Sequence, residues 1–380
     1  PAVTPLVQLE PGRFVLELFH GPTLAFKDVA MQFLSRLMDL ILAKRDRRAT
    51  IVCATSGDTG GAAVEAFRGA DNVDIVVLFP DGRVSDVQRR MMTTPTEGNV
   101  HALAIDGTFD DCQALVKAMF NDHAFRDEVA LSGVNSINWA RVAPQITYYF
   151  AAAVALGSPH RKVSFAVPTG NFGDIFAGYV AKRMGLPVDR LTVASNANDI
   201  LPRTMASGVY EKRGVVATTS PSMDIQVSSN FERYLFEAQS RDAALIRGQM
   251  ASLAQSGRFE VSGGPQRLAQ DFAAGSASEA EVADCIRETL ASSGYQLEPH
   301  TSCGLIASRK QSPSPGIPEI VLATAHPAKF TEAMTEITAT PAPLPDRLAH
   351  LLTDPERVTV LANEVGAVQT YIRDTARAAR

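Results

Sequence analysis

The sequence predicts an α/β protein with two open, mostly parallel sheets. Short apolar, β-branched runs alternate with stretches of helical period along almost the whole chain, a pattern typical of parallel sheets. With 380 residues, the chain is too long for one ordinary domain of roughly 150 residues. Two glycine-containing turns, at 56–61 and 170–174, each follow a predicted strand and open a predicted helix. We therefore expect a strand–turn–helix unit of this kind in each domain.

The first predicted elements are a helix and a compact αβ unit. Apolar side chains recur at helical spacing from Val29 to Leu42, so this segment is predicted to be a helix with one buried face. The αβ unit follows between about 49 and 157. Its strands are predicted at 50–54, 74–79 and 100–105 and within 129–137. Its helices are predicted after the turn 55–61, ending at Phe67, and at about 85–92, 109–120 and 139–156.

A second series of elements begins after residues 157–161, which are rich in turn formers and predict a boundary. Residues 207–230, rich in Ser, Thr and Gly, predict an irregular segment, and the tail from Pro341 is proline-rich and then weakly helical. Strands are predicted at 163–167, 191–194 and 319–323, and helices from 174 to about 185 and at 231–239, 243–255 and 282–292. We predict a smaller domain at 49–157 and a larger one made of 1–48 plus 158–380.

Composition excludes several classes of function. The net charge is only −5, and no basic block is interleaved with aromatic residues, which argues against nucleic acid as a partner. The longest apolar run, Tyr148 to Leu156, is far short of the ~20 residues that span a membrane, and residues 1–11 lack the layout of a signal peptide. The cysteines show no paired spacing, and no histidine shows metal-ligand spacing. We expect no metal, no disulfide and a reducing cytoplasm.

One lysine stands at the start of the first long helix. The turn Gly21 to Phe26 leads into Lys27, where the positive end of the helix and the apolar neighbours Leu24 and Phe26 disfavour an ammonium ion. A lysine placed in this way is neutral often enough to act as a nucleophile. The alternative is an ordinary solvated lysine at a helix start.

The two glycine turns predict anion sites, and the alternative for each is a tight connection between strand and helix without a ligand. Backbone N–H groups at a helix start attract anions, and glycine lets an anion approach the backbone closely. Neither turn has the spacing of a dinucleotide fingerprint or of a phosphate-binding loop with its lysine. Both turns, and Thr324 as well, follow predicted parallel strands, whose carboxyl ends are where ligands collect.

A reactive lysine, two anion sites and a hydroxyl at a strand end together fit one small molecule, pyridoxal 5'-phosphate. Its aldehyde needs a lysine, its phosphate an anion site and its ring nitrogen a hydrogen-bonding partner. The second anion site would hold the carboxylate of an amino-acid substrate. We expect the cofactor in the cleft between the two domains.

Five segments, in order from 20 to 330, resemble the motifs of the threonine synthase family. Residues 20–28 (HGPTLAFKD) resemble its cofactor-lysine motif, and 54–60 (ATSGDTG) its substrate loop. Residues 135–141 (NSINWAR), 170–174 (GNFGD) and 324–330 (TAHPAKF) are similar to three further signatures. The first and last segments distinguish this family from other pyridoxal-phosphate lyases of the same fold.

The resemblance implies fold type II of the pyridoxal-phosphate enzymes and conversion of O-phospho-L-homoserine and water to L-threonine and phosphate. It implies that Lys27 holds the cofactor as a Schiff base and moves protons, and that Thr324 faces the ring nitrogen. The backbone N–H groups of Gly170, Asn171, Phe172 and Gly173 would hold the cofactor phosphate. The substrate carboxylate would bind at Ser56, Gly57, Asp58 and Thr59, with Asp58 also near the cofactor ring hydroxyl.

The leaving phosphate of such a substrate needs a second oxyanion site, because the first is taken by the cofactor. The candidates are Asn135, Ser136, Asn138, Arg141 and Lys329. The alternative for two of them is a helix cap at Asn138 and a solvated face for Arg141. His20, His300 and His326 lie near the motifs, and we expect supporting roles for them, with His326 nearest to the site.

Two other functions stay open. The first is a threonine-synthase-like phospholyase or a serine/threonine dehydratase with the same cofactor, and the second is a non-catalytic α/β module that binds anions. The chain begins with Pro1 rather than Met, and family members carry several tens of residues before this point, so we expect an upstream segment. A monomer or a homodimer is expected.

Overall fold

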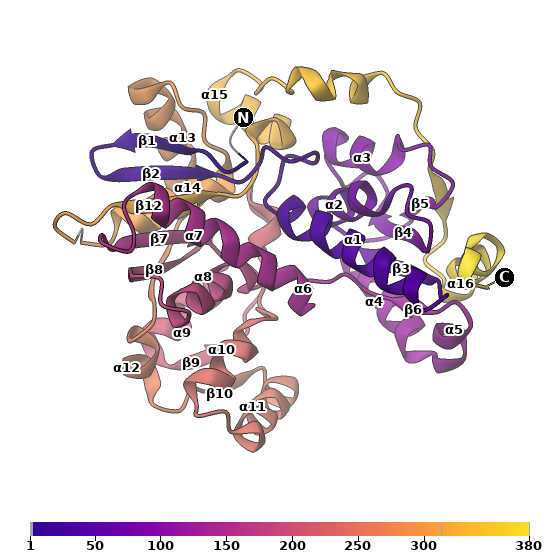
Figure 1. Ribbon diagram of the computed structural model, residues 1–380, viewed down its shortest axis with the longest axis horizontal. Helices are drawn as coiled ribbons and strands as arrows, with labels where there is room; N and C mark the ends of the chain where they lie inside the picture. The colour runs from indigo at the N-terminus through magenta and orange to yellow at the C-terminus, as the bar shows by residue number, and fades with distance from the viewer. Residues whose placement is uncertain (1–2, 313, 380) are drawn as a thin grey trace. The chain divides into compact units, whose positions relative to one another are not determined.

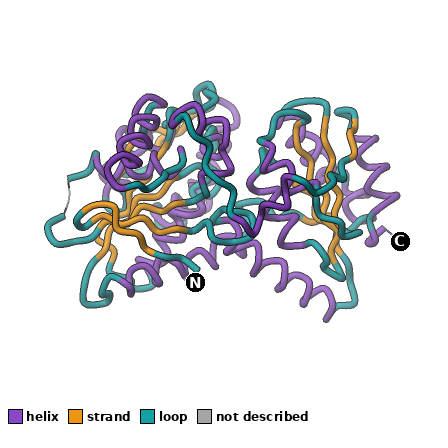
Figure 2. The backbone as a smooth tube through the Cα atoms, turned by 90° about the horizontal axis from the view of Figure 1, so that it is seen from above, coloured by secondary structure: helices purple, strands orange, loops and turns teal. Residues whose placement is uncertain are grey.

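A computed structural model describes residues 3–312 and 314–379 and confirms the predicted α/β class. The chain divides into two compact units. Unit 1 runs up to His20 and from Val142 to Ala342, and unit 2 consists of Gly21–Arg141 and the chain from Pro343 onwards. Figure 1 shows the elements along the chain, and Figure 2 shows strands with helices beside them in each unit.

Unit 1 is built on a six-stranded sheet of order β1-β2-β12-β7-β8-β11. Only β1 is antiparallel to its neighbour within this sheet, as judged for the described residues. The strands are β1 (Leu6–Glu10), β2 (Arg13–Glu17), β7 (Val163–Pro168), β8 (Val188–Ser195), β11 (Ala273–Ser276) and β12 (Glu319–Ala323). A separate antiparallel pair is formed by β9 (Val209–Glu211) and β10 (Arg258–Glu260).

The helices of unit 1 pack on both faces of its sheet. On β7, Phe165 contacts Tyr149 of α7, whereas Ala166 belongs to a core cluster with Cys285 of α13 and Cys303 of α14. The helices are α7 (Ile146–Ala155), α8 (Gly173–Arg183), α9 (Ile200–Ser207), α10 (Phe231–Ala238), α11 (Ala243–Ser256), α12 (Gly264–Ala269), α13 (Glu279–Ser293), α14 (Pro299–Arg309) and α15 (Thr331–Thr338), with short 3-10 turns η1 (Ala143–Gln145), η2 (Pro221–Met223) and η3 (Pro327–Phe330).

Unit 2 is built on a five-stranded parallel sheet of order β13-β5-β4-β3-β6. The strands are β3 (Ala49–Ala54), β4 (Val73–Pro80), β5 (Val100–Ile105), β6 (Leu131–Ser132) and β13 (Thr359–Leu361). The helices are α1 (Lys27–Lys44), α2 (Asp58–Phe67), α3 (Asp86–Thr93), α4 (Phe109–Asn121), α5 (His123–Glu128), α16 (Val365–Thr375) and α6 (Trp139–Val142), whose last residue begins unit 1. Two 3-10 turns, η4 (Asp346–Leu352) and η5 (Arg377–Ala379), lie in the tail.

Strand alternation explains the two cores of unit 2. Ile75 and Val77 of β4 pack with residues of α1 and α2, whereas Val76 and Leu78 pack with α4, α5 and α16. Each face of a parallel sheet is covered by helices, as expected for strands that are apolar throughout.

The units differ from the predicted domain boundaries at 49 and 157. Helix α1 belongs to unit 2, because its Met31 and Leu34 pack on the β3–β4 face. The tail from Pro343 also belongs there, because β13 extends the sheet beside β5 and Val368 of α16 fills the second core. Conversely, α7 belongs to unit 1, where Tyr149 packs against β7.

The predicted single helix at 139–156 is wrong. It is divided into α6, a 3-10 turn and α7, with Pro144 in the turn, because proline has no N–H to donate within a helix. The hairpin β1–β2 and helices α9 and α14 were not predicted. The irregular segment predicted at 207–230 begins with the short strand β9 and contains η2.

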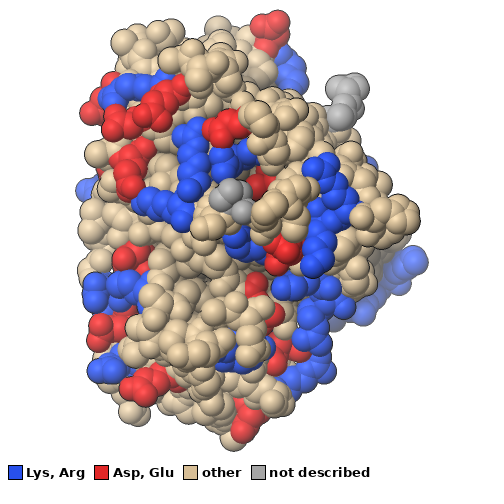
Figure 3. Space-filling model, turned by 90° about the vertical axis from the view of Figure 1, so that its left-hand side faces the viewer, with Lys and Arg blue, Asp and Glu red and all other residues tan. Residues whose placement is uncertain are grey.

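Charged side chains of opposite sign are interspersed on the face drawn in Figure 3. Ion pairs of unit 1 include Arg309 with Glu10 and Lys162 with Asp189. Within the described ranges, no helix is both long and apolar enough to cross a lipid bilayer.

Candidate active site

Lys27 is the first residue of α1, and the turn before it is fixed by local bonds. The Thr23 N–H and hydroxyl both donate to the Asp28 carboxylate. Gly21 must be glycine because a Cβ there would lie 2.4 Å from Asp28 Oδ2. In the same turn, Leu24 has a left-handed backbone with a φ of 58°. The Lys27 side chain is 11% exposed, and its Nζ lies 3.2 Å from Asp58 Oδ2. The turn thus places the largely buried Lys27 amine in contact with the Asp58 carboxylate.

The turn at 55–60 is organised by one hydroxyl. Thr55 Oγ1 accepts the N–H of Gly57 at 2.9 Å and that of Gly60 at 2.8 Å, so the chain turns sharply from β3 into α2. Ser56 is exposed and Thr59 half-buried at the start of α2, whereas Asp58 is buried. The helix start therefore presents polar groups beside a buried carboxylate.

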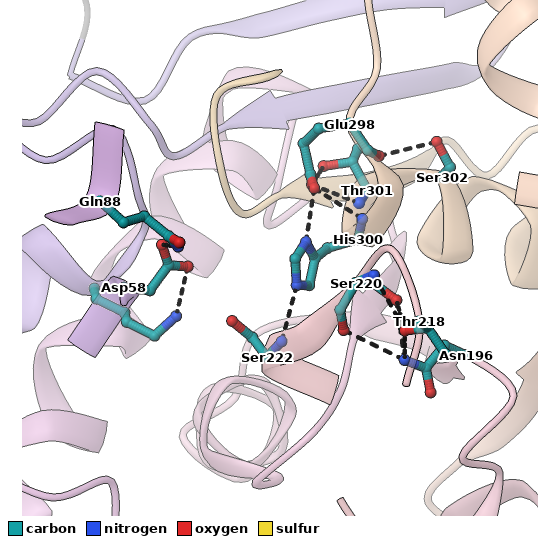
Figure 4. Close-up of polar contacts among 11 residues, drawn as sticks. Asp58, Gln88, Asn196, Thr218, Ser220, Ser222, Glu298, His300, Thr301 and Ser302 are labelled. Carbon is teal, nitrogen blue, oxygen red and sulfur yellow. Dashed lines mark hydrogen bonds and ion pairs between the residues drawn. The ribbon is translucent and has the colours of Figure 1, made fainter. Parts of the chain in front are cut away.

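A glutamine that the sequence analysis did not single out contacts this carboxylate. Gln88 Nε2, from α3, donates to Asp58 Oδ1 at 2.8 Å (Figure 4). Asp58 is thus contacted through one oxygen by Gln88 and through the other by Lys27.

The segment 135–141 follows β6 in the same unit. Asn138 Oδ1 accepts the N–H of Ala140 at 3.0 Å, which supports the capping role. Asn135 is exposed, and Ser136 is half-buried. Arg141 is buried, contrary to the solvated alternative, and Nη1 donates to the carbonyl of Val134 at 2.7 Å. Burial lowers the pKa of the Arg141 guanidinium to about 10. Because β6 and β3 are parallel neighbours, this segment and the 55–60 turn leave the same edge of the sheet.

In unit 1, the loop 170–173 joins β7 to α8. Phe172 has a φ of 62°, and its buried ring contacts Phe231, Tyr234 and Phe272. Gly170 cannot carry a side chain, because a Cβ would lie 2.7 Å from the carbonyl oxygen of Ser222. The loop is therefore held at fixed positions on both sides of Asn171.

Protein donors bind carbonyl groups of this loop, whereas its N–H groups do not donate to protein acceptors in the described ranges. Ser228 Oγ donates to the Gly170 carbonyl at 2.6 Å, and the Asn230 N–H donates to the Asn171 carbonyl at 3.0 Å. Within 3–312 and 314–379, no protein acceptor receives the backbone N–H groups of residues 170–173. Four donors at a helix start fit a phosphate group.

The wall beside this loop is braced by a buried histidine (Figure 4). His300 Nδ1 lies 2.7 Å from Glu298 Oε2, and Nε2 lies 3.2 Å from the N–H of Ser222. Since the carboxylate can only accept, Nδ1 carries the proton and Nε2 accepts the Ser222 N–H. Glu298 also caps α14 through the Thr301 N–H, so the start of α14 is bonded to the segment of Ser222, whose carbonyl lies behind Gly170.

Thr324 directly follows β12, which pairs in parallel with β7. The buried Thr324 and the loop 170–173 therefore leave the same edge of the sheet. In the following turn η3, Lys329 is buried, and His326 Nδ1 accepts the N–H of Ala328 at 3.1 Å. His326 thus caps this turn.

The sequence analysis missed the residues that support the predicted ones. Glu298 followed by Pro299 is the pattern of a helix cap with proline at the first helical position, and it could have revealed α14. The Ser-rich segment before Asn230 contains Ser222 and Ser228, but nothing in its composition indicates that they contact Gly170. Across the described ranges, no cluster of three or more His, Cys, Asp or Glu side chains could hold a metal ion.

Comparison with known proteins identifies the family. Residues 2–323 match the family model described as "Pyridoxal-phosphate dependent enzyme", and residues 301–372 match "Threonine synthase, C-terminal". The threonine synthase of Pseudomonas aeruginosa is 51% identical over 375 residues, which cover 98% of this chain and 80% of that protein. The chain belongs to the threonine synthase family.

Two further comparisons, with another threonine synthase sequence and with a solved structure, lead to the same family. The threonine synthase of Saccharomyces cerevisiae is 43% identical, over 87% of this chain and 71% of that protein. The crystal structure of a PLP-bound threonine synthase from Brucella melitensis superposes with a TM-score of 0.96 and 59% identity, over 99% of this chain and 81% of that one. The predicted cofactor, fold type and activity, a pyridoxal-phosphate-dependent lyase of threonine biosynthesis, are confirmed.

Proposed function

We propose that this chain converts O-phospho-L-homoserine and water to L-threonine and phosphate, with Lys27 as the residue that binds the cofactor. The observation that supports the substrate best is the 51% identity to the Pseudomonas aeruginosa threonine synthase over 98% of this chain. Family membership does not favour the dehydratase or the non-catalytic anion-binding module.

Lys27 is the proposed covalent attachment site and proton carrier. Its amine is largely buried at a helix start, where the helix dipole disfavours the ammonium form, and Asp58 is 3.2 Å away. Bound pyridoxal phosphate supplies an electron sink that stabilises negative charge on the carbon atoms of the substrate. The Lys27 amine would move a proton from one substrate carbon to another.

The backbone of Gly170, Asn171, Phe172 and Gly173 is the proposed site of the cofactor phosphate. Four N–H groups at the start of α8 support this role, because they lack protein acceptors within the described ranges. The Thr324 hydroxyl is proposed to face the ring nitrogen, which is supported by its place at the end of β12, the parallel neighbour of β7. A neutral hydroxyl would leave that nitrogen less protonated than a carboxylate would.

The substrate carboxylate is proposed to bind at Ser56, Gly57, Asp58 and Thr59. The start of α2 attracts anions, and the Thr55 hydroxyl keeps the turn in place before any ligand arrives. Asp58 is also proposed to lie near the cofactor ring hydroxyl.

Arg141 and Lys329 are the proposed cations for the leaving phosphate, with Asn135, Ser136 and Asn138 as neutral donors. Both side chains are buried, and a guanidinium such as that of Arg141 suits bidentate recognition of a phosphate. Asn138 Oδ1 accepts the Ala140 N–H, so the group of Asn138 that would donate to a phosphate is its Nδ2 amide.

The test is a product assay. The purified protein, loaded with pyridoxal phosphate, is given O-phospho-L-homoserine, and inorganic phosphate, L-threonine and 2-oxobutyrate are measured. Equal amounts of phosphate and threonine are expected. Phosphate with 2-oxobutyrate instead of threonine would support a phospholyase, and no phosphate would contradict the proposed substrate.

We further propose a reducing, cytoplasmic compartment, which is supported by four cysteines that are all buried and free of disulfides. Whether the protein is a monomer or a homodimer stays a prediction.

A further inference from the structure

We propose that Gln88 is a positioning residue that holds the Asp58 carboxylate against the Lys27 amine, and that Ser85 sets the direction in which the Gln88 amide points. This inference rests on the proposed role of Lys27 and adds to it the residues that control how readily the Lys27 amine loses its proton. Its elements lie in one unit, on α1, α2 and α3.

The orientation of the Gln88 amide follows from its two partners. The Ser85 hydroxyl donates to Gln88 Oε1 at 3.0 Å, and Gln88 Nε2 donates to Asp58 Oδ1 at 2.8 Å. A reversed amide would set its oxygen against a carboxylate oxygen, and both atoms can only accept. Ser85 is also the N-cap of α3, so the residue that starts this helix orients the amide on its first turn.

The glycine of the turn makes room for this amide. A Cβ at Gly57 would lie 2.5 Å from Gln88 Cδ, and Gly57 has a φ of 135°. Only glycine permits both this backbone angle and such a close approach. The Gln88 amide therefore packs directly on the turn that carries Asp58.

Charge explains why the donor is glutamine. The side chains of Asp58 and Gln88 are each about 6% exposed, and a carboxylate with so little contact with water needs donors. Lysine or arginine at 88 would compete with Lys27 for the charge of Asp58, whereas the neutral amide only orients it. The neighbouring acid Asp28 accepts from Thr23, and Lys27 donates to Asp58.

The proposal makes opposite predictions for two substitutions. Gln88→Met keeps the volume and removes the donor, so the Asp58 carboxylate is less stable as an anion and favours the Lys27 ammonium less. Gln88→Glu places a second negative charge in the same place and favours the ammonium more. Covalent attachment of the cofactor requires the neutral amine. The two variants should therefore shift the pH dependence of attachment in opposite directions.

The experiment measures attachment in the cofactor-free protein. Pyridoxal phosphate is added between pH 6 and 10, the reaction is stopped with borohydride, and the fraction of modified Lys27 peptide is measured by mass spectrometry. We expect the pH of half-maximal rate to fall by about one unit in Gln88→Met and to rise by about one unit in Gln88→Glu. The maximal rate in Gln88→Met should also fall roughly tenfold.

Two controls separate positioning from stability. Gln249→Met removes another buried amide, which bonds to Gln239 and Glu260 in unit 1, and should leave the pH profile unchanged. Ser85→Ala should shift the profile in the same direction as Gln88→Met but less, and Ser85→Thr, which keeps the hydroxyl, should restore it.

Shifts in the same direction for Gln88→Met and Gln88→Glu, or no shift in folded variants, would overturn the proposal. If the unaltered protein is not modified at Lys27 at all, the proposed role of Lys27 fails first, so the two failures are distinguishable.

Discussion

Two turns of this molecule share a local pattern and differ in their surroundings. Each joins a parallel strand to a helix, at 55–60 in unit 2 and at 170–173 in unit 1. In the first, Thr55 accepts two backbone N–H groups, and Asp58 contacts Lys27. In the second, protein donors bind the carbonyls of Gly170 and Asn171.

The acidic residue of each turn makes the difference clearest. Asp58 faces an amine, whereas Asp174, in the first turn of α8, accepts the hydroxyls of Tyr148 at 2.6 Å and Tyr149 at 2.8 Å. One turn therefore carries an aspartate that is paired with a lysine, and the other is followed by an aspartate that is bound by two phenols. Under the proposed assignment, both turns bind anions, and the residues packed around each turn decide which anion fits.

The largest expected effect comes from Lys27. Lys27→Arg should abolish covalent attachment and lower turnover at least about a thousandfold, because a guanidinium does not react with the aldehyde. Lys44→Arg, at the exposed far end of α1, should leave both unchanged. Attachment and turnover are measured by borohydride labelling and phosphate release, and substantial turnover in Lys27→Arg would remove this residue from the mechanism.

Next in size is Gly170→Val, which tests the turn in unit 1. The added side chain would meet the Ser222 carbonyl, and overpacking of about 1–3 kcal/mol should weaken cofactor affinity about ten- to hundredfold. Equilibrium dialysis measures this affinity. Gly248→Ala is the matched control, because a Cβ on that glycine of α11 meets no atom within 4 Å. Unchanged affinity in Gly170→Val would separate the loop from the cofactor.

A crossed pair of substitutions sharpens the comparison. Ser228→Ala removes the donor to the Gly170 carbonyl and should weaken cofactor binding roughly fivefold, with little change in the KM of the substrate. Thr55→Val removes the acceptor of two N–H groups in the other turn and should raise KM with little change in cofactor affinity. If each variant changed both quantities equally, the two turns would not have separate tasks.

The smallest expected effect concerns Tyr148. Tyr148→Phe should lower the free energy of unfolding by about 1–2 kcal/mol, because the buried Asp174 loses a donor. Burial and the charge of Asp174 raise the pKa of Tyr148, so this contribution is complete below a pH of about 10 and is lost as pH rises further, where unfolded tyrosine ionises. Urea unfolding at two pH values measures it. Tyr371→Phe, with a hydroxyl 3.3 Å from His101, is the control for losing a phenol.

The sequence predicted what local pattern determines. Short apolar, β-branched runs located β3, β4, β5 and β7, and the capping box at Ser278 located the start of α13. Each of these signals is contained within a few consecutive residues. The glycine turns and Lys27 were found for the same reason.

What the sequence did not predict depends on contacts between distant segments. Gln88 is 30 positions from Asp58, and His300 is 78 from Ser222, so no local period marks them. The tail was predicted as weakly helical because the three residues of β13 carry no signal until β5 lies beside them. The compact units differ from the predicted domains for the same reason, since packing assigns α1 and the tail to unit 2.

Peptide mapping after borohydride reduction tests the central claim most directly. The protein is loaded with pyridoxal phosphate, reduced and digested, and the modified lysine is located by mass spectrometry. The account predicts modification of Lys27 in the unaltered protein and a higher cofactor concentration for half-modification in Gly170→Val. Modification of Lys329 or another lysine in place of Lys27 would contradict it.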